Sequence, residues 1–518
     1  MSEEGPSKSA LKKAQKDAEK AARKAENAVK QAAQVYQAPV LTIDQLQTST
    51  FGDLPLHQSN YQLDKLSPFP SEATAEPISF RAYLQNSRGT GKTFFAVLRQ
   101  QSQTIQAVVF EDKDLIKYAS SLSKESYVHV TGVIKQVEQP ITSCTIQNLE
   151  VQITKIFALS RAQVLPLQIE DAQRPDSQLN ENPALVRVGR DTLFDNRVID
   201  LRTTTNNSIF KIRAKIQQEF TKFMVSRDFL QITTPKIIPG ASEGGASVFN
   251  VSYFKNEACL AQSPQLYKQM AISGGFQKVF EVGPVFRAES SHTHRHLCEF
   301  TGLDLEMEIQ DNYREVLVFL DSLMKSIFKN VLHDCESEIE TVRKQFDMQM
   351  PEKLVWTETP VIIDFREGVK MLRESGFEQG DLDDLSTETE RQLGKLVREK
   401  YGTDFYILDK FPMSIRPFYT MPDSQDENYS NSYDMFIRGQ EICSGAQRIH
   451  NAEFLLEQLS KKQIPIEPLA SYINAFKYGC PPHGGAGLGL ERIIMLMLGI
   501  QDCRQCCLFP RTPERLTP

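Results

Sequence analysis

The 518-residue chain has no apolar run long enough to cross a bilayer. Its longest strongly apolar stretch, Ile493 to Ile500, is far shorter than the roughly 20 residues that a membrane-spanning helix needs. The N-terminus lacks the apolar segment of a secretory signal, and its acidic residues are unlike an acid-poor mitochondrial leader. The nine cysteines form no compact framework, which favours free thiols in a reducing compartment. We therefore expect a cytoplasmic protein that has no membrane partner.

The chain also lacks the common sequence motifs for nucleotides and for zinc. Neither a Walker lysine pattern nor a dinucleotide GxGxxG pattern is present, which excludes P-loop and Rossmann sites. Three histidines, His292, His294 and His296, are close in sequence but have no matching set of cysteines or carboxylates. Cys503-Arg-Gln-Cys506-Cys507 has CxxC spacing without a second pair at zinc-finger distance. We therefore expect buried free thiols there and no zinc.

Charge is distributed unevenly along the chain. The net charge is -7, yet residues 8–30 hold eight Lys and Arg against three acidic residues. Lysines from Lys8 to Lys24 recur every four residues, so a helix would carry them as one stripe. Like charges at this spacing oppose an isolated helix, so ordering requires an anionic partner. Residues 1–40 are thus predicted to be a lysine-rich extension, helical or disordered; the alternative is a solvated tail without a specific role.

Residues 76–158 have the alternating pattern of short strands. The runs that fit strands are Ile78–Gln85, Lys92–Arg99, Ile105–Phe110, Tyr127–Val137 and Leu149–Phe157. Five strands in so short a segment predict a small closed barrel of the OB type. Aromatic and basic side chains suit a platform for single-stranded nucleic acid, and the candidates are Phe80, Arg81, Phe94 and Arg99. The alternative is that these aromatics belong to the core.

The rest of the chain predicts a hinge and a larger mixed domain. Residues 159–190 are polar, contain three prolines and favour a hinge. Residues 191–518 mix helices and strands, with helical apolar spacing over Ile209–Ser226 and a strand over Phe229–Ile238 that Pro235 interrupts. The predicted fold class is therefore α+β, with an N-terminal OB-fold β-barrel before the mixed domain.

Two segments are candidates for the chemistry. Val282 to Phe300 reads as strand, polar loop and strand, which would hold Arg287 rigidly enough to fork onto a phosphate. Phe300 on the return strand could stack on a base. Pro481 to Met497 reads as a glycine-rich strand entering a helix, with Arg492 in its first turn. Bare glycine backbone and a helix N-terminus with an arginine favour an anionic phosphate.

In combination, these segments resemble the signatures of class II aminoacyl-tRNA synthetases, and specifically those of the aspartyl members of the eukaryotic cytosolic type. Phe286-Arg-Ala-Glu…His-Arg-His…Glu-Phe300 matches the second class signature, and Gly487-Leu-Gly-Leu-Glu-Arg492 matches the third. The segment that ends at Pro235 matches the first, whose proline lies at the dimer interface in that family. The resemblance covers about residue 76 to Pro518. The lysine-rich N-terminus resembles an extension that helps eukaryotic members to hold tRNA.

The resemblance implies a catalytic domain over 191–518 in which an antiparallel sheet flanked by helices carries a bent ATP. Arg287 would contact the α-phosphate and Arg492 the γ-phosphate end, and with Glu441 they are the expected catalytic residues. Glu441 would also bind magnesium with Ser444 beside it, because Mg²⁺ prefers oxygen ligands. The implied ATP-binding residues are Arg287, Ala288, Glu289, Arg295, His296, Leu297, Phe300, Glu441, Gly489, Leu490, Glu491 and Arg492.

Specificity for aspartate rests on two cations. Relatives that activate asparagine or lysine carry an apolar residue where this chain has Lys268. With Arg448, it would give two cations for one side-chain carboxylate, so neutral asparagine would leave them underpaired. Glu243 resembles a mobile loop that closes on the substrate ammonium. The implied aspartate-binding residues are Glu243, Gln265, Lys268, Arg287, Ser444 and Arg448; the alternative for Lys268 is a surface salt bridge.

The implied function is that of a homodimeric aspartate–tRNA ligase. Aspartate and ATP would give aspartyl-adenylate and pyrophosphate, and the aspartyl group would pass to the 3′ end of tRNA(Asp). The barrel would read the anticodon, and the implied tRNA-binding residues are Lys12, Lys13, Lys16, Phe80, Arg81, Gln85 and Arg99. One alternative is a catalytically silent paralogue that binds RNA or regulates. It predicts loss of Arg287, Glu441 or Arg492, and all three are present. A nearer alternative is an enzyme that also charges the asparagine tRNA.

Overall fold

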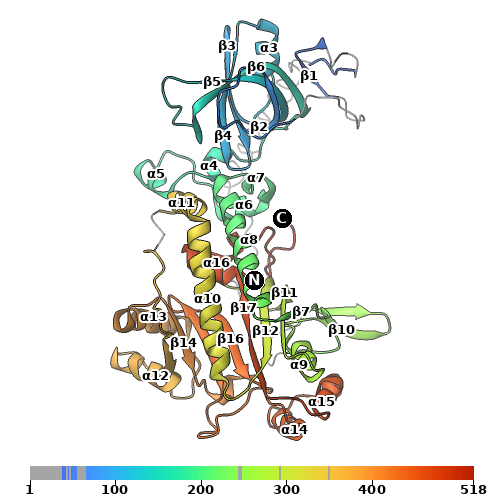
Figure 1. Cartoon of the computed structure of the whole chain (residues 1–518), viewed down its shortest axis with the longest axis vertical. Coiled ribbons are helices and arrows are strands. Elements are labelled where there is room, and N and C mark those ends of the chain that lie inside the picture. The colour runs from blue at the N-terminus through green and yellow to red at the C-terminus, as the bar shows by residue number, and fades with distance from the viewer. Residues whose placement is uncertain are drawn as a thin grey trace, which may run out of the picture. The chain divides into compact units, whose positions relative to one another are not determined.

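The computed structural model describes residues 38–42, 45, 48–54, 66–242, 248–290, 293–347 and 351–518. The chain divides into two compact units, Met1–Pro166 and Leu167–Pro518, whose elements are labelled in Figure 1. Within the described ranges, no helix is both long and apolar enough to cross a membrane. Residues 1–37 of the predicted lysine-rich extension, with Lys12, Lys13 and Lys16, lie outside the described residues, as does Glu243.

The smaller unit contains a closed barrel. Its strands follow the order β4-β3-β2-β5, and β6 pairs with both β4 and β5, which closes the sheet. Strand β1 adds to β6 in parallel. The strands are β1 Phe51–Asp53, β2 Ile78–Thr90, β3 Thr93–Gln100, β4 Gln103–Phe110, β5 Tyr127–Gln136 and β6 Ile146–Ser160. The predicted five-stranded OB-fold is confirmed.

Alternation along the strands builds the barrel core. On β2, Phe80 and Leu84 are fully buried, whereas Arg81 between them is only partly buried. This is the two-residue period of a strand with one face on a core. Helix α3 (Lys113–Ser120), which the sequence did not predict, lies between β4 and β5 and is capped by the Asp112 carboxylate.

The larger unit is built on an eight-stranded sheet. The strand order is β13-β14-β15-β16-β17-β12-β11-β7, antiparallel except for the β13–β14 and β11–β7 pairs. The strands are β7 Leu230–Gln231, β11 Lys278–Phe286, β12 Glu299–Glu308, β13 Ile362–Asp364, β14 Phe405–Asp409, β15 Ser432–Ile437, β16 Gln440–Gln447 and β17 His483–Gly489. The antiparallel sheet with flanking helices confirms the predicted α+β class.

Helices surround this sheet (Figure 1). The longer ones are α8 Thr204–Val225, α9 Gln265–Ser273, α10 Arg314–Asp334, α11 Glu336–Gln345, α12 Phe365–Glu374, α13 Thr387–Tyr401, α14 Ala452–Lys461, α15 Ala470–Phe476 and α16 Leu490–Leu498. Short helices occupy much of the segment predicted as a hinge and its continuation: α4 Ile169–Ala172, α5 Asp176–Glu181, α6 Arg190–Asp195 and α7 Arg197–Asp200. Short 3-10 helices span Met413–Ile415, Glu467–Leu469 and Cys503–Cys506.

Helix α8 shows how sequence spacing fixes the main core. Ile209, Ile212, Ile216 and Phe220 recur at helical spacing and are at most 1% exposed. Burying each side chain contributes roughly 1.5–3 kcal/mol. They pack with side chains of α10 and α16 and with Leu303 and other residues of the sheet. One face of the sheet is thereby covered by helices.

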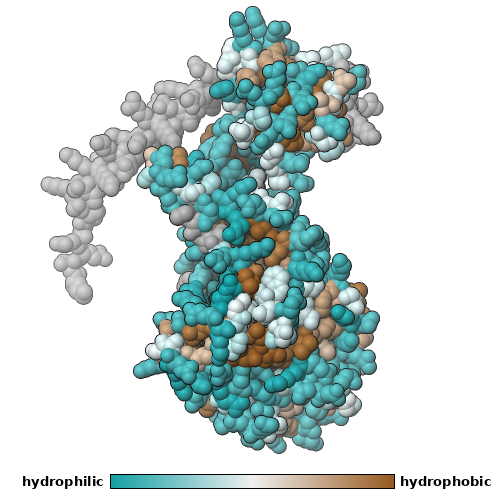
Figure 2. Space-filling view, turned by 60° about the vertical axis from the view of Figure 1, so that its left-hand side comes forward, coloured by the Kyte–Doolittle hydropathy of each residue, from teal (hydrophilic) through white to brown (hydrophobic). Residues whose placement is uncertain are grey.

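The chain around Pro235 forms two short strands rather than one. Strand β7 joins the large sheet, whereas β8 (Ile237–Ile238) joins a small sheet with β9 (Asn250–Tyr253) and β10 (Asn256–Leu260). Proline has no N–H to donate, so the ladder cannot run through it. Leu230 and Ile237 on either side are each 48% exposed. Elsewhere, Figure 2 shows a largely hydrophilic surface on which apolar side chains gather in patches.

Candidate active site

A cavity of about 200 Å³ opens in the larger unit. Strand β12 explains its location, because its alternate residues face opposite sides of the sheet. Leu303 and Leu305 face the helical core, while Asp304 lines the cavity. Most predicted site residues also line it: Gln265, Arg287, Glu289, Arg295, His296, Leu297, Phe300, Glu441, Ser444, Arg448, Gly489, Glu491 and Arg492.

Among the predicted residues that the structure describes, three do not line the cavity. Ala288 is half-buried beside Arg287 on the loop after β11. Leu490 is fully buried in the main core, so its predicted contact with ATP is not supported. Lys268 is 2% exposed and lies behind Asp304, to which it is bound.

At one end of the cavity, Arg287 lies over an aromatic ring. Its guanidinium carbon is 5.5 Å from the centroid of Phe300. The backbone N–H of Arg287 donates to the Cys298 carbonyl at 2.9 Å, which ties the two arms of the loop together. The Arg287 Nε is buried and has no hydrogen-bond partner among the described residues. A guanidinium with an unused donor fits an anionic ligand.

Arg492, in the third signature, contacts the loop of Arg295 and the strand of Glu441. Its Nε donates to the Arg295 carbonyl at 3.4 Å, and its Nη1 donates to the Glu441 carbonyl at 3.3 Å. The Glu441 carboxylate is 3.8 Å from the same Nη1. Glu491 next to it is used internally, because its carboxylate accepts from Arg213 at 2.8 Å and from the Thr301 N–H. Glu491 therefore holds the start of β12 in place.

Asp434 is a site residue that the sequence analysis missed. It pairs in register with Ser444 across β15 and β16. Arg416 donates to the Asp434 carboxylate at 2.8 Å and to the Ser444 hydroxyl at 3.1 Å. Burial raises the pKa of Asp434 to about 6, against the lowering by Arg416, and the Glu441 charge raises it further. A lone aspartate in the apolar run Ser432–Ile437 was the available signal.

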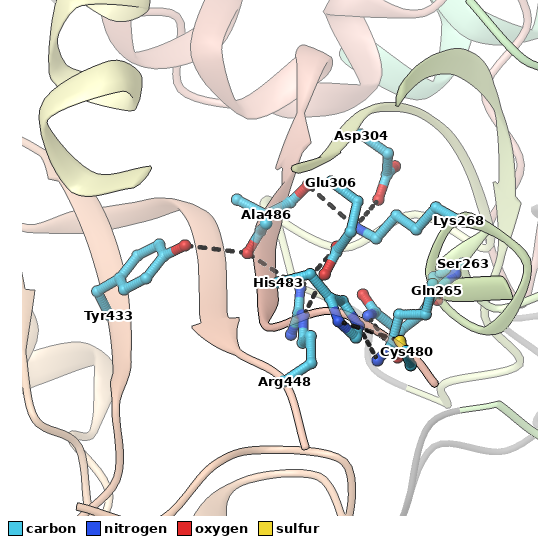
Figure 3. Close-up of polar contacts among 12 residues, drawn as sticks. Ser263, Gln265, Lys268, Asp304, Glu306, Tyr433, Arg448, Cys480, His483 and Ala486 are labelled. Atoms are coloured by element: carbon cyan, nitrogen blue, oxygen red, sulfur yellow. Dashed lines mark hydrogen bonds and ion pairs between the residues drawn. The ribbon is translucent and has the colours of Figure 1, made fainter. Parts of the chain in front are cut away.

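At the far end of the cavity, the two predicted cations already have partners (Figure 3). Lys268 Nζ is 3.1 Å from Asp304 Oδ1 and 3.5 Å from Glu306 Oε2. Arg448 Nε donates to Glu306 Oε1 at 2.9 Å. The prediction assigned these two cations to one substrate carboxylate, and in the structure two buried carboxylates already face them. The alternative of a surface salt bridge is also wrong for Lys268, because this pair is buried.

The glycine run of β17 makes room for these carboxylates. A Cβ on Gly487 would lie 2.9 Å from Asp304 Oδ1, and one on Gly485 would collide with the Glu306 side chain. We expected the glycines to admit a ligand to bare backbone. In the structure they also admit the buried carboxylates of the neighbouring strand.

His483 at the start of β17 belongs to a neutral hydrogen-bond chain (Figure 3). Burial lowers the pKa of His483, against the raising by Glu306. Its Nδ1 donates to the Pro481 carbonyl at 2.8 Å, so its Nε2 accepts from the Gln269 amide at 3.0 Å. Gln269 in turn accepts from Gln265 at 2.9 Å. Gln265 is thereby oriented at the cavity wall.

The cysteines near the site are structural. Cys503, Cys506 and Cys507 are buried and free, and burial raises the pKa of each thiol. The prediction of buried free thiols is confirmed. Among the described residues, no group of three or more His, Cys, Asp or Glu is arranged to hold a metal ion.

In the barrel, two of the predicted RNA contacts are buried. Phe80 is fully buried against Phe69, and Arg99 is 2% exposed in a bidentate pair with Glu125 at 2.7 and 2.8 Å. Their predicted roles are corrected, since a base cannot reach Phe80 in the core. Phe95 points outward instead, with the Arg88 guanidinium 5.8 Å from its ring centroid. Strand alternation after the buried Phe94 was the signal that was missed.

The other predicted polar readers remain on the outer face of β2. Arg81 and Gln85 are partly buried and alternate with the core residues Phe80 and Leu84. Gln85 accepts a hydrogen bond from Arg99 at 3.2 Å. They can therefore meet a ligand on the barrel surface without unfolding the core.

Comparison with known proteins agrees with this architecture. Residues 189–513 match the family described as "tRNA synthetases class II (D, K and N)", and residues 78–159 match "OB-fold nucleic acid binding domain". The human "Aspartate--tRNA ligase, cytoplasmic" is 50% identical over 448 residues, which cover 86% of this chain and 89% of the relative.

Solved structures give the same result. The aspartyl tRNA synthetase from Entamoeba histolytica is 42% identical, with a TM-score of 0.83, over 93% of this chain and 98% of that one. An asparaginyl-tRNA synthetase from Pyrococcus horikoshii, complexed with asparaginyl-adenylate, is 28% identical, with a TM-score of 0.73, over 85% and 96%. The chain therefore belongs to the class II aminoacyl-tRNA synthetases, within the aspartate–tRNA ligase family.

Proposed function

We propose that this chain is an aspartate–tRNA ligase of the cytoplasm. It joins aspartate and ATP to aspartyl-adenylate and pyrophosphate, and then transfers the aspartyl group to the 3′ end of tRNA(Asp). The observation that carries the choice of amino acid is the buried cluster of Lys268, Arg448, Asp304 and Glu306 at the end of the cavity. Arg287, Glu441 and Arg492 share that cavity, which argues against a silent paralogue.

Aspartate occupies the end of the cavity formed by Asp304, Gln265 and Arg448. Its ammonium pairs with Asp304, which draws that carboxylate from Lys268 and leaves Lys268 and Arg448 to bind the side-chain carboxylate. Bidentate arginine is well suited to carboxylates. We also assign Glu243 to the substrate ammonium, and Ser444 and Arg287 to the reacting carboxylate.

ATP occupies the rest of the cavity. Phe300 stacks on the adenine, Arg287 binds the α-phosphate and Arg492 lies at the γ-phosphate end. The segment Arg295–Leu297 lines the phosphate side. The unused Nε of Arg287 supports this assignment, because an anion would satisfy it.

Magnesium fits the carboxylates of Asp434 and Glu441. Asp434 Oδ1 is buried and has no hydrogen-bond partner among the described residues, and the Glu441 charge raises the Asp434 pKa. Two carboxylates that repel each other beside Ser444 suit a cation that keeps several waters. Held by these residues, magnesium would neutralise charge on the phosphates of ATP. We assign Glu441, Asp434 and Ser444 to this role.

Activation needs no nucleophile from the protein. The α-carboxylate of aspartate attacks the α-phosphorus in line, and pyrophosphate leaves. Arg287 stabilises the charge that develops on the α-phosphate, and Arg492 holds the leaving pyrophosphate. The protein contributes position, because both reactants are held in one cavity. In the second step a terminal ribose hydroxyl of tRNA attacks the aspartyl carbonyl, and AMP leaves.

We propose four functional parts of the chain. Residues 1–40 form a tRNA-binding extension that includes Lys12, Lys13 and Lys16, 76–158 an anticodon-binding domain, 159–190 a hinge and 191–518 the catalytic domain. The matches at 78–159 and 189–513 support the second and fourth. On the barrel, Phe95 and Arg88 are better placed than Phe80 and Arg99 to meet RNA, with Arg81 and Gln85 nearby.

We also propose a homodimer through the segment around Pro235. Leu230 and Ile237 are half exposed on the two strands beside it, and apolar side chains at strand edges are suited to a self-complementary contact. The test is sedimentation of the wild type and of an Ile237→Glu variant, which should release monomers.

The activity is tested by amino-acid-dependent exchange of pyrophosphate into ATP. Aspartate, asparagine and lysine are compared, followed by charging of purified tRNA(Asp) and of the asparagine tRNA. Exchange with aspartate alone and charging of tRNA(Asp) alone are expected. No exchange with any of the three would overturn the proposed function. Charging of both tRNAs would replace it by an enzyme of relaxed specificity.

A further inference from the structure

The first turns of helix α13 contact two segments beside the nucleotide cavity, the loop between β11 and β12 and the turn before Glu441. The helix starts at Thr387, after the Ser386 cap, and its residues do not line the cavity. Its side chains nevertheless reach the loop between β11 and β12. Arg295 Nη1 donates to Glu390 Oε2 at 2.8 Å, and Arg391 is 3.2 Å from the His294 ring nitrogen.

The Arg295–Glu390 pair is largely shielded from water. The two side chains are 16% and 9% exposed. Burial raises the pKa of Glu390 to about 7, against the lowering by Arg295, while Glu441 raises it and Arg492 lowers it. A buried carboxylate is costly unless it is paired, so Glu390 and Arg295 depend on each other. The pair is therefore a fixed point of the loop between β11 and β12.

Arg295 is held from a second side by the third signature. Its carbonyl accepts from Arg492 Nε at 3.4 Å, while its side chain is held by Glu390. The carbonyl of the preceding His294 accepts from the Cys503 N–H at 2.9 Å. These contacts fix the backbone and the side chain of one residue independently. The next residues, His296 and Leu297, line the cavity.

The same helix is pressed against the turn before Glu441. Gly439 in that turn has a φ of +68°, and a Cβ there would lie 2.5 Å from the Glu390 carbonyl oxygen. A Cβ on Gly394 of α13 would collide with the Gly439 backbone. Both glycines are needed for this close approach. Glu390 on α13 thus contacts both the loop that carries Arg295 and the turn before the Glu441 strand.

We propose that Glu390 is a positioning residue for ATP, whose carboxylate holds Arg295 and, through it, the segment 293–297 against the nucleotide. Glu390 acts through Arg295 and does not touch the substrate. This proposal rests on the assignment of the cavity to ATP. Aspartate, at the Lys268 end of the cavity, is not affected by it.

The test is a set of single and double variants in the exchange assay with the full chain. Glu390→Gln keeps the shape of the side chain and removes its charge. Losing a charge-assisted hydrogen bond predicts a KM for ATP that is about 10-fold higher. The KM for aspartate should remain as in the wild type. In an Arg295→Gln background, Glu390→Gln should have no further effect.

A matched control is available on the same helix. Lys400 near the end of α13 pairs with Glu367 at 3.1 Å on the surface, and Lys400→Gln should leave both KM values unchanged. An unchanged KM for ATP in Glu390→Gln would overturn the proposal. So would equal losses for ATP and aspartate with a lower unfolding midpoint, or an additive loss in the Arg295→Gln background. If the wild type shows no exchange, the proposed function fails. The affinities of the wild type and of Glu390→Gln for ATP, measured by calorimetry, still decide the role of Glu390.

Discussion

Replacing Lys268 by Met tests the proposed aspartate site most directly. Methionine keeps the length of the apolar stem and removes the ammonium, which is 3.1 Å from Asp304 and 3.5 Å from Glu306. The change thus removes one cation from a buried group of two cations and two carboxylates. Both substrate binding and folding stability should respond.

The stability loss follows from the carboxylates that remain. Removing one partner of a buried ion pair costs about 3–5 kcal/mol. Two features of the structure place Lys268→Met near the lower value. Arg448 still holds Glu306 at 2.9 Å, and burial already raises the pKa of Asp304, so that carboxyl can take up a proton. The loss should therefore be smaller at pH 5 than at pH 8, because protonated Asp304 needs no cation.

The activity with aspartate should fall as well. Without Lys268, the side-chain carboxylate of aspartate loses a buried partner, which costs about 2–5 kcal/mol. That range corresponds to a fall of about 30-fold to about 4,000-fold in kcat/KM for aspartate. The assay is exchange of pyrophosphate into ATP at saturating ATP, with the aspartate concentration varied. The KM for ATP should not change.

Lys325→Met is the matched control. Lys325 on α10 also pairs with a buried aspartate, Asp321 at 2.7 Å, whose pKa burial likewise raises. This variant should lose stability and keep its activity for aspartate, because α10 does not line the cavity. If Lys268→Met keeps the wild-type kcat/KM for aspartate, the proposed carboxylate site is wrong. If both variants lose activity equally, the loss reflects stability alone.

Three further predictions concern other parts of the chain. Folding raises the pKa of Glu390 from 4.5 to about 7, so the folded protein holds the proton more tightly than the unfolded chain, and the free energy of unfolding falls as the pH rises from 4.5 to 7. Glu390→Gln cannot titrate there, so its thermal unfolding should lack this fall. Phe95→Ala should raise the KM for tRNA about 10-fold and leave pyrophosphate exchange unchanged, since stacking contributes about 1–3 kcal/mol. Phe80→Ala should instead destabilise the barrel by about 3–5 kcal/mol in denaturant unfolding.

Each of these predictions has a contrary result. A Glu390→Gln variant whose unfolding midpoint follows the wild type from pH 5 to pH 8 would show that Glu390 does not titrate there. Loss of tRNA charging in Phe80→Ala at full stability, with none in Phe95→Ala, would restore the first assignment of the RNA-contacting ring.

The signature segments were predictable because their function is local. The strand, loop and strand of Val282–Phe300 place Arg287 close to Phe300, because Arg287 follows β11 directly and the register joins Val285 to Phe300 and Phe286 to Glu299. The glycine strand and the helix carrying Arg492 are likewise contiguous in sequence. A sequence motif predicts a site when the residues that form the site are close together in the sequence.

What could not be predicted depends on contacts between distant segments. Lys268 and Asp304 are brought together by the packing of α9 against β12, and Glu390 reaches Arg295 from a helix almost a hundred residues later. The face of β2 on which Phe80 lies depends on strand register, which one residue of shift reverses. Composition and residue spacing do not predict which distant segments pack together or which face of a strand is buried.

The pairing of Lys268 and Arg448 changes the argument for specificity. Two unpaired cations would reject asparagine simply because the amide is neutral. In the structure, Asp304 and Glu306 already balance both cations, so the empty site has no excess charge. Discrimination must then arise when the substrate ammonium engages Asp304 and weakens its hold on Lys268. Aspartate supplies a carboxylate to replace that partner and asparagine does not, so asparagine leaves a buried ammonium underpaired. On this reasoning, Asp304→Asn should weaken the binding of aspartate, because the substrate ammonium loses its carboxylate partner, and should still prefer aspartate to asparagine, because Lys268 then keeps only Glu306 at 3.5 Å and a substrate carboxylate supplies its second partner.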